Sequence, residues 1–363
     1  MKKVIEIVAT VMILLMSVIF FTSCTSSVLA GDRDENINAN AVTKVEAKKD
    51  EKIRIGFSLP SQYEERWVKD RQNIEEECKK LGIELIVQIA NEDIARQEAQ
   101  CENMISRGIK VLILAPHDIE SAAAIVDKAH NAGVKVISYD RLVRGTVVDV
   151  YISFDNVKVG EIQGKWLIDN VEEGNIAMLY GAPTDDSAKL LMEGAMKYIK
   201  PKVDSGDYKV VMQQPCIDCE PDHAMKHMED ALVATENNIQ GVLAYNDDIS
   251  GGCIEALSAY GLAGKVPITG QGAELAAARR IIEGTQGMTV FKDTRELGKV
   301  AVETAVKMAK GEDLAINSKV NNDKIDVPSL LLTPVAVDKE NIDKILIDSG
   351  YLKKDDVYVS YRQ

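Results

Sequence analysis

Short apolar runs alternate with amphipathic helical patterns along most of this chain, and this alternation restricts the fold more than any other feature. Buried strands are predicted at Ile53–Leu59, Leu85–Ile89 and Val111–Ala115, and the segments between them carry apolar residues at helical spacing. The pattern continues to a last long helix at Arg295–Lys310 and an extended segment at Pro328–Val337. Repeated strand–helix units form parallel sheets with helices on both faces, so the sequence predicts an α/β fold.

The length and the charge of the chain limit the number of domains and the kinds of partner that it can have. The chain has 363 residues, which is too long for one ordinary hydrophobic core and suits two domains. Its formal net charge is -14 at pH 7, and such a surface repels the phosphates of nucleic acids. We therefore expect two α/β domains and no nucleic-acid partner.

The N-terminus has the features of a targeting segment. A basic start precedes an apolar run at Ile7–Phe21, and Cys24 follows after two small residues. This arrangement resembles a bacterial lipobox, in which Cys24 is lipid-modified after cleavage; the alternative is an uncleaved signal anchor. We expect a signal segment at residues 1–24 and a disordered tether at residues 25–51, which lack apolar periodicity. Both alternatives place the body of the protein at the extracytoplasmic face of the cell membrane.

Several predicted strands end in polar side chains. One ends in Asp140-Arg141, the next ends in Asp155-Asn156, and a later strand ends at Lys292. A carboxylate beside a guanidinium at the carboxyl edge of an open α/β sheet lies where ligands bind. A sugar hydroxyl suits such a site because it both donates and accepts hydrogen bonds.

The sequence has no set of residues typical of catalysis. The first strand is followed by Leu59-Pro60-Ser61 where a dinucleotide-binding enzyme has G-x-G-x-x-G, and there is neither a P-loop nor a serine nucleophile elbow. A repressor of related fold would begin with a helix-turn-helix, where this chain has its targeting segment. We therefore predict a binding protein that is not an enzyme and carries no cofactor.

Seven motifs occur in order between residue 52 and the C-terminus. They are Glu65–Arg71, Tyr139–Arg141, Tyr151–Asn156, Asn246-Asp247, Gly251-Gly252, Met288–Lys292 and Val327–Pro334. Together they resemble the D-xylose-binding proteins of bacterial ABC importers, a family of type I periplasmic sugar-binding proteins. The resemblance implies two Rossmann-like lobes (periplasmic binding protein-like I) joined by a three-strand hinge and closing on a pyranose. The implied lobes are residues 52–155 plus 292–327 and residues 156–291 plus 328–363.

The resemblance also assigns ligand contacts. They fall to Arg66 and Lys69 in the first loop of the N-lobe, Asp140 and Arg141 after strand four, Asn246 in the C-lobe, and Lys292 near the second hinge. The residues alone allow other interpretations. Arg66 and Lys69 suit a solvated helix start, Asp140 and Arg141 could pair with each other, and Asn246 suits a turn.

Three positions depart from the family pattern. Ser187 stands where the family has an Asn, Cys219 lies near the place of a Trp that flanks the sugar, and Gly272 replaces an Asp. These changes remove a stacking surface and a charge-assisted hydrogen bond of about 1.5–3 kcal/mol. The rings that could replace the Trp are Trp67, Tyr63 and Phe57. We include Ser187 and Trp67 among the expected ligand contacts, although Trp67 also heads an apolar helical face typical of a core residue.

The cysteines beyond Cys24 fall into two groups. Cys78, Cys101 and Cys253 lie on apolar helical faces and are predicted to be buried thiols. Cys216 and Cys219 form C-x-x-C, with two histidines following at i, i+4 spacing. A local disulfide, free thiols and a metal site all fit this second pattern.

Two functional hypotheses follow. In the first, a membrane-tethered extracytoplasmic protein binds D-xylose or a similar monosaccharide and delivers it to an ABC permease by hinge closure. In the second, it presents its closed, sugar-bound form to a membrane histidine kinase. The expected partners are a monosaccharide, the membrane through the N-terminus, and a permease or a sensor kinase.

Overall fold

The computed structural model describes residues 52–182, 186–216 and 220–358. The predicted signal segment with Cys24, the predicted tether and Cys219 lie outside the described residues. Within the described ranges, no helix has the length and the hydrophobicity needed to cross a membrane.

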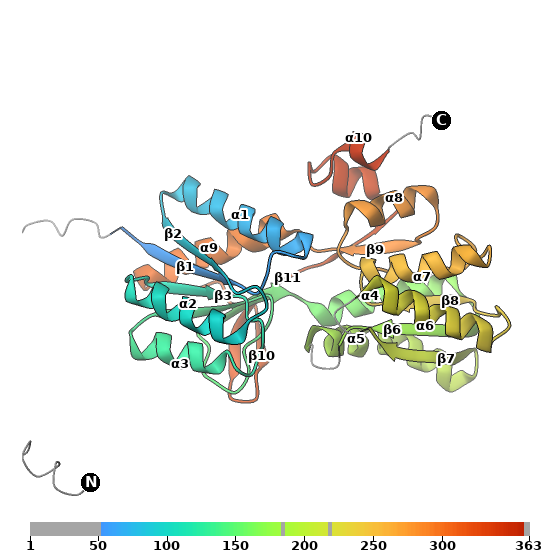
Figure 1. Cartoon of the computed structure of the whole chain (residues 1–363), viewed down its shortest axis with the longest axis horizontal. Coiled ribbons are helices and arrows are strands. Elements are labelled where there is room, and N and C mark those ends of the chain that lie inside the picture. The colour runs from blue at the N-terminus through green and yellow to red at the C-terminus, as the bar shows by residue number, and fades with distance from the viewer. Residues whose placement is uncertain (1–51, 183–185, 217–219, 359–363) are drawn as a thin grey trace, which may run out of the picture. The chain divides into compact units, whose positions relative to one another are not determined.

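The first sheet has seven strands (Figure 1). They are β1 (Arg54–Leu59), β2 (Glu84–Ile89), β3 (Val111–Leu114), β4 (Lys135–Tyr139), β5 (Val150–Phe154), β10 (Ser318–Asn321) and β11 (Asp326–Leu332). Their order across the sheet is β10-β11-β5-β4-β3-β1-β2. Every neighbouring pair is parallel except β10 and β11, which are antiparallel. The predicted α/β fold with a parallel sheet is confirmed.

Helices cover both faces of this sheet, which explains why a central strand such as β3 is apolar and buried at every residue. The helices are α1 (Glu65–Leu81), α2 (Ile94–Ser106), α3 (Ala123–Asn131) and α9 (Thr294–Lys310). Alternate residues of β3 point to opposite faces. Ile113 packs in a core with α1 and α9, and Leu112 packs in a second core with α2 and α3.

A smaller parallel sheet of three strands follows, in the order β7-β6-β8. Its strands are β6 (Gly174–Tyr180), β7 (Tyr208–Pro215) and β8 (Gly241–Ala244), and the helices of this region are α4 (Asn156–Asn170), α5 (Asp186–Ser205), α6 (Pro221–Ala234), α7 (Asp247–Ala259) and α8 (Leu275–Glu283). Helices α4 and α5 approach each other closely at Gly160. A Cβ on Gly160 would lie only 1.8 Å from the carbonyl oxygen of Leu191. Glycine at this contact therefore sets how α5 packs against α4.

A third, two-stranded sheet pairs β9 (Met288–Phe291) antiparallel with β12 (Val335–Asp338). The sequence predicts one extended segment at Pro328–Val337, but the structure divides it between β11 in the large sheet and β12 in this small one. Pro334 lies at the break, since its nitrogen carries no hydrogen for a strand ladder. A π-helical turn at Asp343–Ile347 and α10 (Lys354–Val357) follow β12.

The chain passes between the large sheet and the smaller sheets at three places, and polar residues occupy them. β5 leads into α4, β9 leads into α9, and β11 leads into β12. At the first, Asp155 caps α4 by accepting from Lys158 N at 2.9 Å. At the second, Asp293 caps α9 by accepting from Arg295 N at 3.0 Å. The carboxylates at these two strand ends are therefore the N-caps of the helices that follow.

Candidate functional site

Two predicted site residues meet where α1 begins and β4 ends. Arg66 lies in the first turn of α1, and Asp140 directly follows β4. Arg66 Nη2 lies 2.5 Å from Asp140 Oδ1, and Arg66 Nε donates to Asp70 Oδ2 at 3.1 Å. Asp140 therefore has Arg66 as its ion-pair partner at the carboxyl edge of the large sheet.

Asp140 has an uncommon backbone conformation. Its φ of 63° lies in the left-handed region, which few residues other than glycine adopt. Its backbone N–H donates to the Ile152 carbonyl at 2.8 Å, and its own carbonyl accepts from Tyr151 Oη at 2.8 Å and Ser153 Oγ at 3.0 Å. These three bonds to β5 hold Asp140 in place at the edge of the sheet.

The charge of Asp140 depends on three cations. Its side chain is buried, and burial alone would raise the pKa of Asp140. Arg66, Lys292 and Arg141 outweigh that effect, so the pKa of Asp140 lies below its ordinary value. Lys292 directly follows β9 and is only 9% exposed. A cation from the two-stranded sheet thus acts on a carboxylate of the seven-stranded sheet.

Trp67 lies beside both arginines of the predicted site. The Arg66 guanidinium lies 4.8 Å and the Arg141 guanidinium 5.3 Å from the centre of its ring. Its indole N–H donates to Glu64 Oε1 at 2.9 Å, and the side chain is 1% exposed. Trp67 packs in the core of the large sheet, and its ring supports the two guanidinium groups through cation–π contacts.

The two other rings named from the sequence have contrasting environments. Phe57 is fully buried and packs edge-on against Tyr139, with 5.7 Å between ring centres. Tyr63 lies in the loop before α1 and is 74% exposed. Of the three candidate rings, Tyr63 is therefore the one with a large solvent-accessible face.

Lys69 points toward the C-terminal segment. Its ammonium lies 2.8 Å from Glu65 Oε1 and 4.7 Å from the centre of the Tyr351 ring. The Arg295 guanidinium lies 5.2 Å from the same ring. Lys69 therefore takes part in a contact that joins α1 to Tyr351.

Asn246 caps the helix that follows β8. Its side-chain oxygen accepts from Ile249 N at 2.9 Å. Its neighbour Asp247 is fully buried, where Oδ1 accepts from Gln286 at 2.8 Å and Oδ2 accepts from Thr289 at 2.9 Å. Asp247 thereby ties the start of α7 to β9, which fixes where Asn246 lies.

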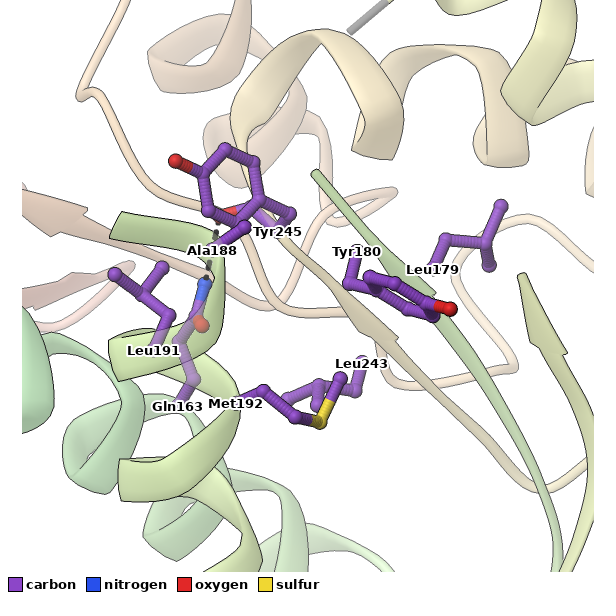
Figure 2. A pocket seen from close by; sticks show the side chains of 8 residues that line it. All are labelled: Gln163, Leu179, Tyr180, Ala188, Leu191, Met192, Leu243 and Tyr245. Atoms are coloured by element: carbon purple, nitrogen blue, oxygen red, sulfur yellow. Dashed lines mark hydrogen bonds between the residues drawn. The ribbon is translucent and has the colours of Figure 1, made fainter. Parts of the chain in front are cut away.

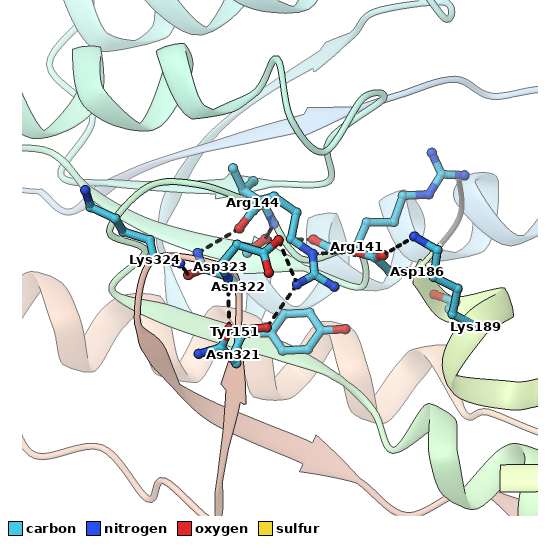
Figure 3. Close-up of polar contacts among 12 residues, drawn as sticks. Arg141, Arg144, Tyr151, Asp186, Lys189, Asn321, Asn322, Asp323 and Lys324 are labelled. Atoms are coloured by element: carbon cyan, nitrogen blue, oxygen red, sulfur yellow. Dashed lines mark hydrogen bonds and ion pairs between the residues drawn. The ribbon is translucent and has the colours of Figure 1, made fainter. Parts of the chain in front are cut away.

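Ser187 and its neighbour Asp186 lie in the first turn of α5. Ser187 Oγ accepts from Asn156 Nδ2 at 3.4 Å, so it joins the starts of α4 and α5. Asp186 Oδ2 lies 2.5 Å from Nε of Arg144, a residue of the β4–β5 connection (Figure 3). Arg144 also donates to the Asn321 carbonyl at 3.1 Å.

Gly272 has a backbone that favours glycine, with φ of 133°. A Cβ at this position would lie 3.2 Å from Asp247 Oδ2 and 3.6 Å from Glu274 Oε1. Burial, together with Asp248, Asp247 and Glu65, raises the pKa of Glu274 to about 8. The carboxylate of Glu274 therefore lies beside position 272, where the sequence resemblance predicts an aspartate.

Two hollows lie among residues of the smaller parallel domain, and Asp140 lines neither of them. The first has a volume of about 10 Å³ and is lined by Gln163, Leu179, Tyr180, Ala188, Leu191, Met192, Leu243 and Tyr245 (Figure 2). It is the size of one water molecule and too small for a sugar. The second, of about 370 Å³, shares Tyr180, Ala188 and Met192 and includes Lys189.

The described cysteines are free thiols. Cys78, Cys101, Cys216 and Cys253 are all buried, as predicted for three of them. Burial raises the pKa of the Cys78 and Cys101 thiols to about 12, which keeps them protonated at neutral pH. Cys219 lies outside the described residues.

Sequence reasoning missed Asp70. Its side chain is fully buried between Arg66 and Tyr139, whose hydroxyl donates to Asp70 Oδ1 at 2.6 Å. The signal was present in the sequence, because Asp70 lies on the same helical face as Trp67 and Ile74. A carboxylate among the apolar residues of a helix requires a buried partner.

Comparisons with known proteins agree with this architecture. The family model for the periplasmic binding protein domain matches residues 55–313. The D-xylose-binding periplasmic protein of Escherichia coli (strain K12) is 42% identical over 339 residues, covering 93% of this chain and 98% of that protein. The multiple sugar-binding periplasmic receptor ChvE of Rhizobium radiobacter is 37% identical over 326 residues, with coverage of 84% and 92%.

A solved structure of a solute-binding protein has a similar fold. It is a carbohydrate transporter solute-binding protein from Chloroflexus aurantiacus in complex with D-glucose. It superposes with a TM-score of 0.79 at 32% identity, covering 84% of this chain and 98% of that chain. The chain belongs to the periplasmic binding protein family and has its type I fold.

Proposed function

We propose that this periplasmic binding protein binds D-xylose or a similar monosaccharide outside the cytoplasm and passes it to an ABC importer. It would do so as a carrier and not as an enzyme. The observation that carries the proposal is the Arg66–Asp140 ion pair beside Arg141, at the carboxyl edge of the seven-stranded sheet, in which the Asp140 carboxylate is buried and the Arg66 side chain is 23% exposed. The names of the similar proteins from Escherichia coli and Rhizobium radiobacter support the same class of ligand.

The chemistry of the pair suits a polyol. The Asp140 carboxylate accepts hydrogen bonds from hydroxyl groups, and the guanidinium groups of Arg66 and Arg141 donate to hydroxyl oxygens. Lys292, whose charge acts on Asp140, adds a further donor. Asn246 would contribute from the start of α7, and Ser187 from the start of α5.

Hinge closure is the proposed mechanism. The two lobes would be residues 52–155 plus 292–327 and residues 156–291 plus 328–363, joined where the chain passes between the sheets. A ligand that contacts both lobes stabilises the closed arrangement by its differential affinity for that arrangement. The permease would then distinguish the closed form from the open form.

The anchoring and the identity of the membrane partner extend the proposal. Lipid modification at Cys24, or an uncleaved signal anchor, would hold the protein at the extracytoplasmic face of the cell membrane. The second candidate role, presentation of the sugar-bound form to a membrane histidine kinase, uses the same ligand site. Mass spectrometry of the N-terminus would test the lipid, and co-purification of the permease or the kinase with sugar present would separate the two roles.

Titration calorimetry with a panel of pentoses, hexoses and inositol tests the ligand. We expect saturable heat with D-xylose or a closely related pyranose, and an affinity weakened roughly tenfold to a hundredfold in Asp140→Asn. The matched control is Asp93→Asn, because Asp93 caps α2 through Arg96 N and asparagine caps a helix equally well. Flat titrations for every sugar of the panel would reject the proposal.

A further inference from the structure

Asp70 is a buried carboxylate that contacts Arg66 of the proposed ligand site but is not itself one of the proposed ligand contacts. It comes from α1, one turn after Arg66, and its side chain is completely buried. Its two oxygens have different partners. Oδ1 accepts from the Tyr139 hydroxyl at 2.6 Å, and Oδ2 accepts from Arg66 Nε at 3.1 Å.

Arg66 therefore lies between two carboxylates, one in the core and one at the sheet edge. Its Nε is bonded to Asp70, and its Nη2 lies 2.5 Å from Asp140 Oδ1. Because the guanidinium is planar and rigid, fixing Nε also fixes the direction of both Nη groups. Asp70 thus determines where Arg66 presents its charge to Asp140.

The surroundings of the Arg66 Nη2 atom are a second observation that points to a ligand beside Asp140. It is buried, and it has no aligned hydrogen-bond acceptor among the residues that the structure describes. Its contact with Asp140 Oδ1 is a close ion pair. An N–H group held in this state is available to the oxygen of a bound polyol.

We propose that Asp70 and Tyr139 are positioning residues of the ligand site, which act on the sugar only through Arg66 and Asp140. This inference rests on the proposed function and deepens it. Tyr139 is the residue before Asp140, so its ring and hydroxyl link the end of β4 to α1. Asp70 accepts from both Tyr139 and Arg66, and the three side chains act as one unit.

A double-mutant cycle on the full chain tests the proposal. Asp70→Asn, Asp140→Asn and the double variant are titrated with D-xylose, or with the sugar that binds best in the panel. We expect Asp70→Asn to weaken binding about tenfold in the natural background, the size of one lost charged interaction. In the Asp140→Asn background the same change should alter the dissociation constant by less than about twofold. The carboxylate that Arg66 is positioned against is already absent in that background, so losing Asp70 has little further effect on the sugar.

Two tyrosine variants keep the test independent of folding. Tyr139→Phe removes only the hydroxyl that bonds Asp70, and Tyr208→Phe removes a buried hydroxyl that donates to the Val171 carbonyl at 2.6 Å in the smaller domain. Both should lower the melting temperature, but only Tyr139→Phe should weaken sugar binding, by a factor of about three to ten.

The outcomes separate the inference from the proposed function. Equal losses of affinity for Asp70→Asn in both backgrounds, or equal effects of the two tyrosine variants, would overturn the positioning role while the proposed function stands. Absence of binding by the natural chain to every sugar would overturn both. Coupled losses, with Tyr208→Phe binding normally, would establish the positioning role.

Discussion

Arg144 in the β4–β5 connection and Asp186 in the first turn of α5 form an ion pair, with Nε 2.5 Å from Oδ2 (Figure 3). The pair joins a loop of the seven-stranded sheet to a helix that packs on α4 of the smaller parallel domain. Only 23% of the Arg144 side chain and 15% of the Asp186 side chain are exposed. The attraction between Arg144 and Asp186 is therefore less screened by solvent than that of the surface ion pairs of this protein.

Under the proposed hinge closure this ion pair joins the two proposed lobes, so its removal should favour their separation. We predict that Arg144→Gln weakens sugar binding about threefold to tenfold, because the loss of a half-buried pair costs on the order of 1 kcal/mol. The change should appear mainly as faster dissociation in stopped-flow fluorescence. Lys189→Gln is the control, since Lys189 contacts the same carboxylate at 3.2 Å but is 62% exposed. Equal effects of the two variants would contradict a role for Arg144 in closure.

Asp140→Asn should abolish most of the sugar affinity without unfolding the chain. Asparagine tolerates the left-handed backbone that Asp140 adopts, so the β4–β5 bonds should persist. The lost charge should weaken binding roughly tenfold to a hundredfold, the range for a charge-assisted hydrogen bond. Calorimetry measures the affinity, and circular dichroism checks the fold. Normal affinity in this variant would remove Asp140 from the ligand site.

The pH dependence of binding should follow from the same carboxylate. The pKa of Asp140 lies below its ordinary value of 3.8, so Asp140 stays ionised well into the acid range. A depressed pKa means that its contribution is present above pH 3.8 and is lost only as the pH falls through the lower, folded value. We expect an unchanged dissociation constant between pH 6.5 and about pH 4.5. A loss of affinity complete by about pH 5 would contradict this assignment.

Much of the fold could be predicted from residues that act locally. Strands such as β3 are apolar on both faces, which indicates helices on both sides, and the polar residues at strand ends mark where the chain changes sheets. The division of Pro328–Val337 between two sheets was not predicted, because strand pairing is a long-range property. The Arg144–Asp186 pair escaped sequence reasoning for the same reason, since the partners lie 42 positions apart.

The candidate site was predicted less completely than the fold. Asp140 and Arg141 are recognisable because they follow a buried strand, and their edge position follows from the parallel sheet. The partner of Asp140 could not be foreseen, because Arg66 approaches it from a different element. Asp70 could have been found as a carboxylate on the buried face of α1, but its contact with Tyr139 depends on how α1 packs against β4.

Glu274 should make stability depend on pH near neutrality. Its pKa is raised to about 8 by burial and by Asp248, Asp247 and Glu65, whereas the unfolded chain has the ordinary value of 4.5. Between these values the folded state holds a proton that the unfolded state has released, so stability should fall as the pH rises. Glu274→Gln should raise the melting temperature at pH 8 and leave it nearly unchanged at pH 4.5. Glu255→Gln, at an exposed position of α7, serves as the control, and an equal rise in both variants would reject this prediction.

Lys69 should contribute less to sugar binding than Arg66, although the sequence groups them together. The Lys69 ammonium is engaged by Glu65 at 2.8 Å and by the Tyr351 ring, while Arg66 lies against Asp140. Lys69→Met retains the apolar stem of the side chain and should weaken binding by less than about threefold, whereas Arg66→Met should weaken it by more than about tenfold. Because Lys69 contacts Tyr351, its replacement should instead lower the melting temperature, and Tyr351→Leu should lower it similarly. Calorimetry and thermal unfolding on the same preparations measure both effects. An equal loss of affinity in the two methionine variants would place Lys69 in direct contact with the ligand.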